Sequence, residues 1–224
     1  MRPRYDEVMR ELGDAIIGMT YPEGTWLPSV AALHQQFGCS RGVVREAVRG
    51  LEERGLVEVH PGRGVRVHQR EAWDTHNRHV LRSSIDRGPE PEVLWLAIDA
   101  RAAVECEAAT RAIDHARDAD FRLLATRVEA MERASDGHAF VSAEIWFHRT
   151  LALLSANSLL ARLAEPLHVV LAEVRHERAP DRAGASIRQH RRILEGVSSR
   201  EPQLATESIV AYAERLAEWV GARR

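Results

Sequence analysis

The chain has 224 residues and a mass of 25.2 kDa, with 45% hydrophobic residues, 29% charged residues and a formal net charge of −2. This composition excludes a disordered chain, and no apolar run approaches the roughly 18–20 residues that a membrane span needs. The length suits one large domain or two small ones. Because the N-terminus lacks the apolar core of a signal peptide, we expect a cytoplasmic protein.

The cysteines and the charge distribution limit the kinds of fold and partner to be expected. Cys39 and Cys106 lie far apart, which argues against a disulfide scaffold and against a cysteine zinc ribbon. Residues 1–70 hold 10 arginines against 9 acidic residues, whereas residues 71–224 hold 21 against 24. Within residues 41–70 the balance is 7 against 4, a local basic excess that hints at a polyanionic partner.

Apolar residues at helical spacing predict three helices at the start of the chain. Their ranges are 5–19, 29–37 and 41–54. Pro28 is assigned to the first turn of the second helix, where proline is tolerated. Gly38 is suited to a left-handed helix end and Ser40 to the N-cap of the third helix, so a tight turn joins the two.

The third of these helices has two different faces. Its apolar stripe, which is expected to pack against the first two helices, consists of Val44, Ala47, Val48 and Leu51. Arg41, Arg45 and Arg49 recur every four residues on another side, with Gly42 beside them. Arginines at this spacing suit a helix laid in the major groove of DNA, where they reach phosphates or guanine. The alternative is a charged face that is merely solvated.

A β-hairpin is predicted directly after this helix. The valines that alternate with polar residues, and that are expected to face inward, are Val57, Val59, Val65 and Val67. Gly62 and Arg63 lie in the turn between them, with Arg63 free to reach the minor groove or the adjacent backbone. A basic-tipped hairpin after a helix-turn-helix indicates a winged helix. The alternative is a capping hairpin with a solvated tip.

Several spaced elements of this region resemble the winged helix-turn-helix of GntR-family bacterial transcription regulators, over residues 5–68. They are Leu27-Pro28-Ser29, Phe37-Gly38-Cys39-Ser40-Arg41, Val44-Arg45-Glu46-Ala47, Leu51, Gly55-Leu56-Val57 and Gly62-Arg63-Gly64. The resemblance implies DNA contacts from Ser40, Arg41 and Arg45 in the recognition helix and from Gly62 and Arg63 in the wing. The family's polar pair after Leu-Pro-Ser is Val30-Ala31 here, so one common operator contact is missing.

The rest of the chain is predicted to be helical. A linker over 71–90, with a candidate helix from Trp73 to Ile85, separates a DNA-binding domain (1–70) from a second domain (91–224). Candidate helices of the second domain span 91–115, 117–134, 137–155, 157–178, 184–199 and 202–221. The expected fold is mainly α, a winged helix with a small β-hairpin followed by an antiparallel helical bundle.

One helix of this bundle carries a candidate metal-binding pair. Glu144 and His148 are four residues apart and therefore project from the same helix face. His190, on a later helix, is the third candidate ligand. A pair of this kind is a weak signal by itself, and buried, hydrogen-bonded histidines are the alternative.

The second domain also resembles the FCD domain of the FadR branch of GntR regulators, over most of residues 92–220. The likeness is carried by Asp99-Ala100-Arg101, Glu105, Phe147-His148, Asn157, Glu165-Pro166-Leu167 and His190-Arg191-Arg192-Ile193-Leu194. Many members bind a divalent metal through an aspartate, a histidine four residues later and two further histidines. The matching positions here are Glu144, His148, His190 and Tyr212.

The resemblance thus implies one divalent metal ion, with zinc, nickel or manganese suited to mixed nitrogen and oxygen ligands. Tyr212 is a poor ligand near neutral pH because the pKa of a phenol is about 10. His168 and His176 are candidate substitutes. The alternative is a metal-free pocket in which His148, His190 and Tyr212 hydrogen-bond an organic effector.

Arg101 and Tyr212 are the candidate effector-binding residues by the same resemblance. The family position of Arg101 faces the pocket, where a guanidinium grips a carboxylate in bidentate fashion, and family effectors are often small organic acids. The alternative for Arg101 is a salt bridge with Asp99 or Glu105.

These patterns together predict a ligand-responsive transcription regulator, in the family's usual mode a repressor that its effector releases. A homodimer would place two recognition helices about one DNA turn apart on a near-palindromic operator. One competing class is a metal-dependent enzyme built on the bundle. Against it, the sequence shows no paired nucleophile and base. Another is a constitutive DNA-binding protein with a decayed effector site.

Overall fold

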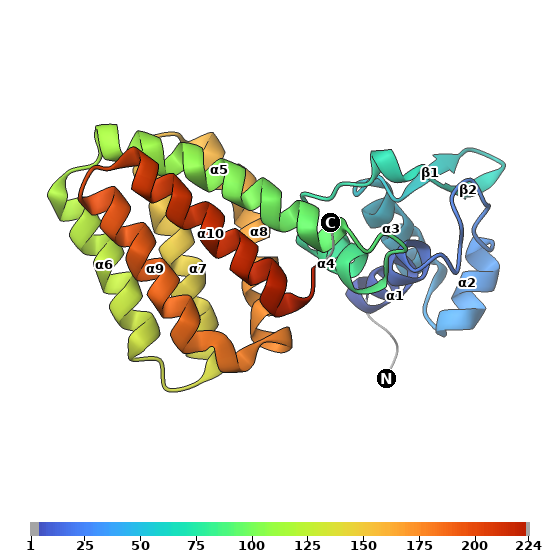
Figure 1. Cartoon of the computed structure of the whole chain (residues 1–224). Coiled ribbons are helices and arrows are strands. Elements are labelled where there is room, and N and C mark those ends of the chain that lie inside the picture. The colour runs from blue at the N-terminus through green and yellow to red at the C-terminus, as the bar shows by residue number, and fades with distance from the viewer. Residues whose placement is uncertain (1–4, 223–224) are drawn as a thin grey trace. The chain divides into compact units, whose positions relative to one another are not determined.

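The computed structural model describes residues 5–222, and the chain divides into two compact units, Met1–Pro91 and Glu92–Arg224. The first unit combines helices with a two-stranded antiparallel sheet, and the second is entirely helical in its described part (Figure 1). The expected fold class, mainly α with a small β-hairpin, is confirmed.

The first unit begins with three helices and a hairpin. They are α1 (Tyr5–Ile17), α2 (Val30–Phe37), α3 (Arg41–Glu52), β1 (Val57–His60) and β2 (Gly64–Val67). Ser29 caps α2 by accepting a hydrogen bond from the Ala32 amide at 3.2 Å. The assignment of Pro28 to the first turn was therefore wrong, because Pro28 precedes the cap. Gly38 ends α2 in the left-handed region at φ 60° and Ser40 caps α3, both as predicted.

The apolar stripe of α3 forms the core of this unit with α1. Val44, Ala47 and Leu51 are fully buried, in one cluster with residues of α1 such as Leu12 and Ile16. Burial of this stripe turns the opposite face of α3 to the outside. The predicted packing of the apolar stripe of α3 against the preceding helices is therefore confirmed.

The hairpin pairs Val57 with Val67 and Val59 with Val65. Val57 and Val67 are buried, but Val59 is 38% exposed, which corrects the expectation that all four valines face inward. Trp26 adds an isolated bridge to Arg66 at the edge of β2.

A short 3₁₀ helix (Arg70–Ala72) and α4 (Arg78–Arg87) complete the unit, and α4 packs against α1. The predicted start of this helix at Trp73 was wrong. Asn77 is the N-cap, and its side chain accepts hydrogen bonds from the amides of His79 and Val80. Trp73 has extended backbone instead and is buried.

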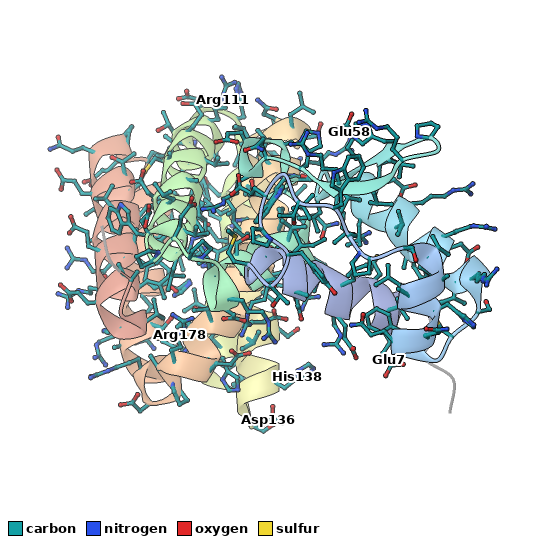
Figure 2. All side chains as sticks on the ribbon, turned by 90° about the vertical axis from the view of Figure 1, so that its right-hand side faces the viewer. Glu7, Glu58, Arg111, Asp136, His138 and Arg178 are labelled. Atoms are coloured by element: carbon teal, nitrogen blue, oxygen red, sulfur yellow. The ribbon has the colours of Figure 1, made fainter. Side chains whose placement is uncertain are left out.

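The second unit is an antiparallel helical bundle. Its helices are α5 (Val93–His115), α6 (Asp118–Glu132), α7 (Gly137–Leu154), α8 (Ser158–Arg178), α9 (Ala183–Ser198) and α10 (Pro202–Val220), with a 3₁₀ turn at Pro180–Arg182. Helix α7 packs between α6 and α8, and α10 packs on α5 and α9. Exposed arginines such as Arg111 and Arg178 project outwards (Figure 2). Across residues 5–222, no helix combines the length and apolar character that a membrane span requires.

Candidate nucleic-acid interface and ligand site

The predicted DNA-reading face of α3 is exposed and its cations are free. Arg41, Gly42, Arg45 and Arg49 are all exposed, on the side opposite the buried stripe. Among the described residues, none of the three arginines has an ion-pair or hydrogen-bond partner for its guanidinium. Free guanidinium groups on one helix face are available to phosphates and to base edges.

The wing adds a second cationic surface and an aromatic residue. Gly62 and Arg63 are exposed in the turn, and the Arg63 guanidinium carbon lies 5.9 Å from the centre of the Trp26 ring. Trp26 is 45% exposed, and its ring contacts His60 edge-on at 5.2 Å. Nothing in the sequence pattern marks Trp26, because an isolated tryptophan is more often a partly buried packing residue.

Inside the bundle lies a cluster of polar and charged side chains, each at most 2% exposed, which we call the buried polar cluster. Its members are Arg101 and Glu105 on α5, Glu144 and His148 on α7, His168 and Arg175 on α8, Ser186 and His190 on α9, and Tyr212 on α10. The cluster contains the candidate residues Arg101, Glu144, His148, His168, His190 and Tyr212 of the sequence analysis, but not His176. Charged groups removed from water in this way need close partners.

Glu144 is held by three donors. The Tyr212 hydroxyl donates to its Oε1 at 2.8 Å, the Ser186 hydroxyl donates to the same oxygen at 3.2 Å, and Nε of Arg175 donates to Oε2 at 2.8 Å. Burial alone would raise the pKa of Glu144, but the Arg175 guanidinium and the neighbouring groups hold it below its usual value. Glu144 is therefore an anion in the interior. Burial raises the pKa of Tyr212 above its usual value, so the phenol stays protonated.

His148 and His190 point their Nε2 atoms at each other, 3.1 Å apart. Nδ1 of His190 lies 2.8 Å from the Ser186 carbonyl oxygen, and Nδ1 of His148 lies 2.8 Å from Oε1 of Glu105. An acceptor oxygen beside each Nδ1 favours a proton on that atom, and in neutral rings of this form both Nε2 atoms carry lone pairs. Burial, with His148 nearby, lowers the pKa of His190 to about 3 and keeps that ring neutral. In this form the two lone pairs face each other, an arrangement that suits a cation between them.

The donor set at this point fits a divalent metal. Ligand atoms of Glu144, His148 and His190 all lie within 4.8 Å of one another. Two nitrogen ligands about 2.0–2.1 Å from a zinc ion are themselves roughly 3.0–3.4 Å apart, which brackets the observed 3.1 Å between the two Nε2 atoms. Glu144 reaches Arg175 and Tyr212 as well, so it is shared between this group and its other partners.

Glu105 and His168 form a second part of the buried polar cluster. Oε1 of Glu105 lies 3.0 Å from Nε2 of His168 and 3.8 Å from Nε of Arg101. An ion pair with Asp99 or Glu105 was the alternative role predicted for Arg101. The structure shows the pair with Glu105, whereas Asp99 is exposed. The Arg101 guanidinium also lies 5.2 Å from the centre of the Tyr212 ring. The position of His168 could not be predicted from the sequence. It lies on a different helix from His148 and His190, and sequence spacing does not show how separate helices pack.

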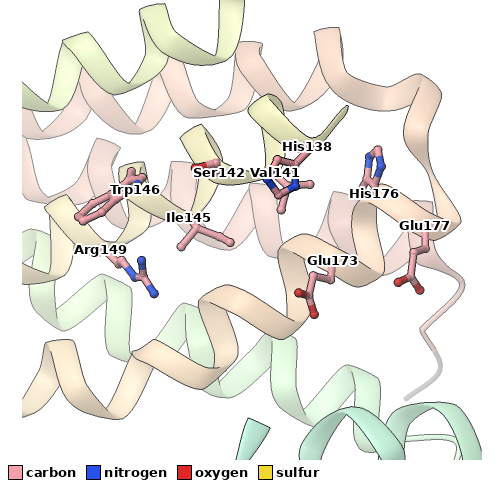
Figure 3. A pocket seen from close by; sticks show the side chains of 9 residues that line it. All are labelled: His138, Val141, Ser142, Ile145, Trp146, Arg149, Glu173, His176 and Glu177. Atoms are coloured by element: carbon pink, nitrogen blue, oxygen red, sulfur yellow. The ribbon is translucent and has the colours of Figure 1, made fainter. Parts of the chain in front are cut away.

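His176, the other candidate substitute ligand, lies elsewhere. It lines a surface pocket of about 310 Å³ between α7 and α8 (Figure 3). The pocket is lined by His138, Val141, Ser142, Ile145, Trp146, Arg149, Glu173, His176 and Glu177. It shares no residue with the buried polar cluster, so His176 does not join the candidate metal ligands.

Comparison with known proteins agrees with both halves of the structure. Residues 4–67 match the profile of the gntR family of bacterial regulatory proteins, and residues 97–215 match the FCD domain. The chain is 28% identical to the repressor NanR of Citrobacter rodentium over 214 residues, covering 92% of this chain and 80% of that protein. It is also 28% identical to the galactonate operon transcriptional repressor of Escherichia coli over 160 residues, covering 71% of this chain and 70% of that protein.

Solved structures share the fold at lower sequence identity. Lar, which controls the expression of the Listeria monocytogenes agr system, superposes with a TM-score of 0.71 at 15% identity, covering 100% of this chain and 99% of that one. For McbR/YncC of E. coli the TM-score is 0.54 at 16% identity, covering 99% and 98%. The relatives are regulators of transcription and not enzymes, which removes the enzyme alternative. The chain belongs to the gntR family of bacterial transcription regulators, in the branch whose second domain is an FCD domain.

Proposed function

We propose that this regulator is a repressor whose hold on its operator is released by a small carboxylate bound in the buried polar cluster. Two observations carry the proposal. Three arginines of α3 are exposed without a partner in the described structure, and buried arginines of the second unit have nitrogens without a hydrogen-bond acceptor. Nε of Arg101 and both terminal nitrogens of Arg175 have no hydrogen-bond acceptor among the described residues. Donors left in this state favour a ligand rich in acceptor oxygens.

DNA is read by α3 and the wing. The residues that would contact DNA are Ser40 at the N-cap of α3, Arg41, Gly42, Arg45 and Arg49 on α3, Gly62 and Arg63 in the turn, and Trp26 beside them. A homodimer on a near-palindromic operator would present this set twice, with the two recognition helices about one DNA turn apart. A regulator of this kind works on the chromosome, and we therefore place the protein in the bacterial cytoplasm.

Glu144, His148 and His190 would hold one divalent ion, with zinc, nickel or manganese compatible with the donors. The bound ion would supply positive charge and open coordination positions for effector oxygens. Arg101 would take the effector carboxylate, turning from its long contact with Glu105. The galactonate operon repressor is named after a sugar acid, and this class of carboxylate heads the compounds to be tested.

The test is release of DNA by an acid. Purified, zinc-loaded protein is bound to a labelled duplex from the intergenic region next to its gene, and sugar acids and hydroxy acids are titrated in while fluorescence anisotropy is followed. We expect at least one acid to lower the affinity for DNA about 5- to 150-fold, the usual range of allosteric coupling. Arg101→Gln should bind the duplex normally and lose the response.

A protein that holds the duplex unchanged in every acid, and whose melting temperature no acid shifts, would instead be the constitutive DNA-binding protein considered above. An Arg101→Gln variant that responds like the wild type would remove Arg101 from the effector site.

A further inference from the structure

Glu105 is a buried carboxylate that joins three helices through one oxygen atom. It is 1% exposed, and its Oε1 lies 2.8 Å from Nδ1 of His148 on α7, 3.0 Å from Nε2 of His168 on α8 and 3.8 Å from Nε of Arg101 on its own helix. It is not one of the candidate ligands around His190, but with His148 and His168 it forms a second group whose ligand atoms lie within 4.8 Å of one another. Its contacts raise the question of what this charge does for the rings that face it.

The contact with His148 selects one of the two neutral forms of that ring. A carboxylate 2.8 Å from Nδ1 favours a proton on Nδ1, and the lone pair is then left on Nε2, which points at Nε2 of His190. A carboxylate in this position also makes the imidazole a better metal ligand. Glu105 thus favours both the tautomer and the ring orientation that His148 needs to bind a metal ion.

Removal of this carboxylate would allow a different arrangement. His148 could then carry its proton on Nε2 and donate it to Nε2 of His190, 3.1 Å away. That ordinary hydrogen bond would satisfy both nitrogens and occupy the position of the metal ion. The same pair of rings therefore has a metal-binding form and a closed form, and Glu105 favours the first.

We propose that Glu105 is the positioning residue of the metal site and that it keeps His148 in the Nδ1-protonated form that leaves Nε2 free for the ion. The proposal rests on the metal site of the proposed function. His168 contacts the same oxygen, but it neither faces His190 nor touches Glu144 in the described structure. It shares Glu105 with His148 and is not needed to orient His148, which makes it the matched control.

The first measurement needs no metal. The side-chain ¹⁵N shifts of zinc-free, isotope-labelled protein report which nitrogen of His148 carries the proton, with His148→Gln identifying its signals. We expect the Nδ1-protonated form in the wild type and the Nε2-protonated form in Glu105→Gln. A wild-type ring protonated on Nε2, or a ring unchanged in Glu105→Gln, would overturn the proposal.

The second measurement is zinc affinity, by competition with a chromophoric chelator. Glu105→Gln should bind zinc about 10- to 100-fold more weakly than the wild type, the usual effect of losing the partner of a ligating histidine. His168→Gln should stay close to the wild type, and the melting temperature of each zinc-free variant shows whether it is folded. Equal zinc affinity of Glu105→Gln and the wild type would overturn the proposal. A wild type that binds no zinc, nickel or manganese would refute the metal site, and the tautomer measurement would still decide the role of Glu105.

Discussion

At the scale of single residues, the buried polar cluster is a balanced set of charges. The guanidinium groups of Arg101 and Arg175 offset the carboxylates of Glu105 and Glu144 when the histidines are neutral. A divalent ion would add two positive charges to this interior. An anionic effector offsets them, so the metal and the acid each make the other easier to accommodate.

The first prediction concerns removal of the metal. Zinc at 100 times its dissociation constant should stabilise the fold by about 2.7 kcal/mol, because the ion binds the folded ligand set alone. A chelator should therefore lower the melting temperature of the wild type and leave that of His148→Gln unchanged. His138→Gln, near the start of α7 and in the surface pocket, should respond like the wild type. A chelator effect that persists in His148→Gln would place the ion elsewhere.

The second prediction concerns Trp26. Its ring supports Arg63 at 5.9 Å, and an exposed cation–aromatic contact contributes about 0.5–1 kcal/mol. Trp26→Ala should thus weaken DNA binding roughly two- to fivefold in an anisotropy titration. Trp146, in the second unit, is also 45% exposed and also contacts arginines, so Trp146→Ala is the matched control and should bind DNA normally. An equal loss of DNA affinity in both variants would mean that Trp26 does not contribute specifically to DNA binding.

At the scale of elements, the ligand site depends on how closely α9 and α10 pack, since His190 and Tyr212 come from these two helices. The helices meet at Gly196, where an added Cβ would lie 2.6 Å from the backbone of Ala205. No side chain fits at that distance without moving a helix. A glycine thus sets the spacing of α9 and α10 beside the buried polar cluster.

The third prediction follows from that contact. Gly196→Ala should lower the free energy of unfolding by roughly 1–3 kcal/mol, as overpacking does. Gly184, on the same helix, has only the flexible end of Arg188 within 4 Å, so Gly184→Ala should be neutral or stabilising by up to about 1 kcal/mol. Urea unfolding of both variants is the measurement. A Gly196→Ala protein as stable as Gly184→Ala would show that α9 and α10 can separate freely.

Elements were predictable where local chemistry marks their ends. Most helix bounds fall within two residues of the prediction, because caps such as Ser40 and breakers such as Pro202 are visible in the sequence. The linker helix was misplaced because Asn77 was not recognised as its cap. Glu144 and His148 follow from helical spacing. Glu105 and His168 do not, because the contacts of Glu105 with His148 and His168 arise from the packing of α5 against α7 and α8.

At the scale of the whole molecule, the chain combines a DNA-reading unit with a ligand-sensing unit. The first unit holds 13 arginines against 13 acidic residues and the second holds 18 against 20, so attraction to DNA rests on local arginines rather than on net charge. A single α3 with a few such contacts holds DNA weakly, and two copies on one duplex multiply the contacts without new chemistry.

The fourth prediction is therefore the stoichiometry of the complex. Sedimentation should give twice the 25.2 kDa of one chain for the free protein, and two chains on each operator duplex. A half-operator should bind much more weakly than the whole one. One chain per duplex, with equal binding to the half-operator, would refute the dimeric reading of a near-palindromic site.

The central claim, that α3 reads operator DNA, is tested most directly by an anisotropy titration of the intergenic duplex with the wild type, Arg45→Ala and Arg192→Ala. Arg192 is an exposed arginine of α9 and serves as the control. We predict saturable binding that exceeds binding to scrambled DNA and weakens as salt rises. Loss of one base-reading arginine costs about 1–3 kcal/mol, so Arg45→Ala should bind roughly 5- to 150-fold more weakly while Arg192→Ala binds normally. Wild-type binding no better than to scrambled DNA, or an Arg45→Ala variant as tight as the wild type, would contradict the account.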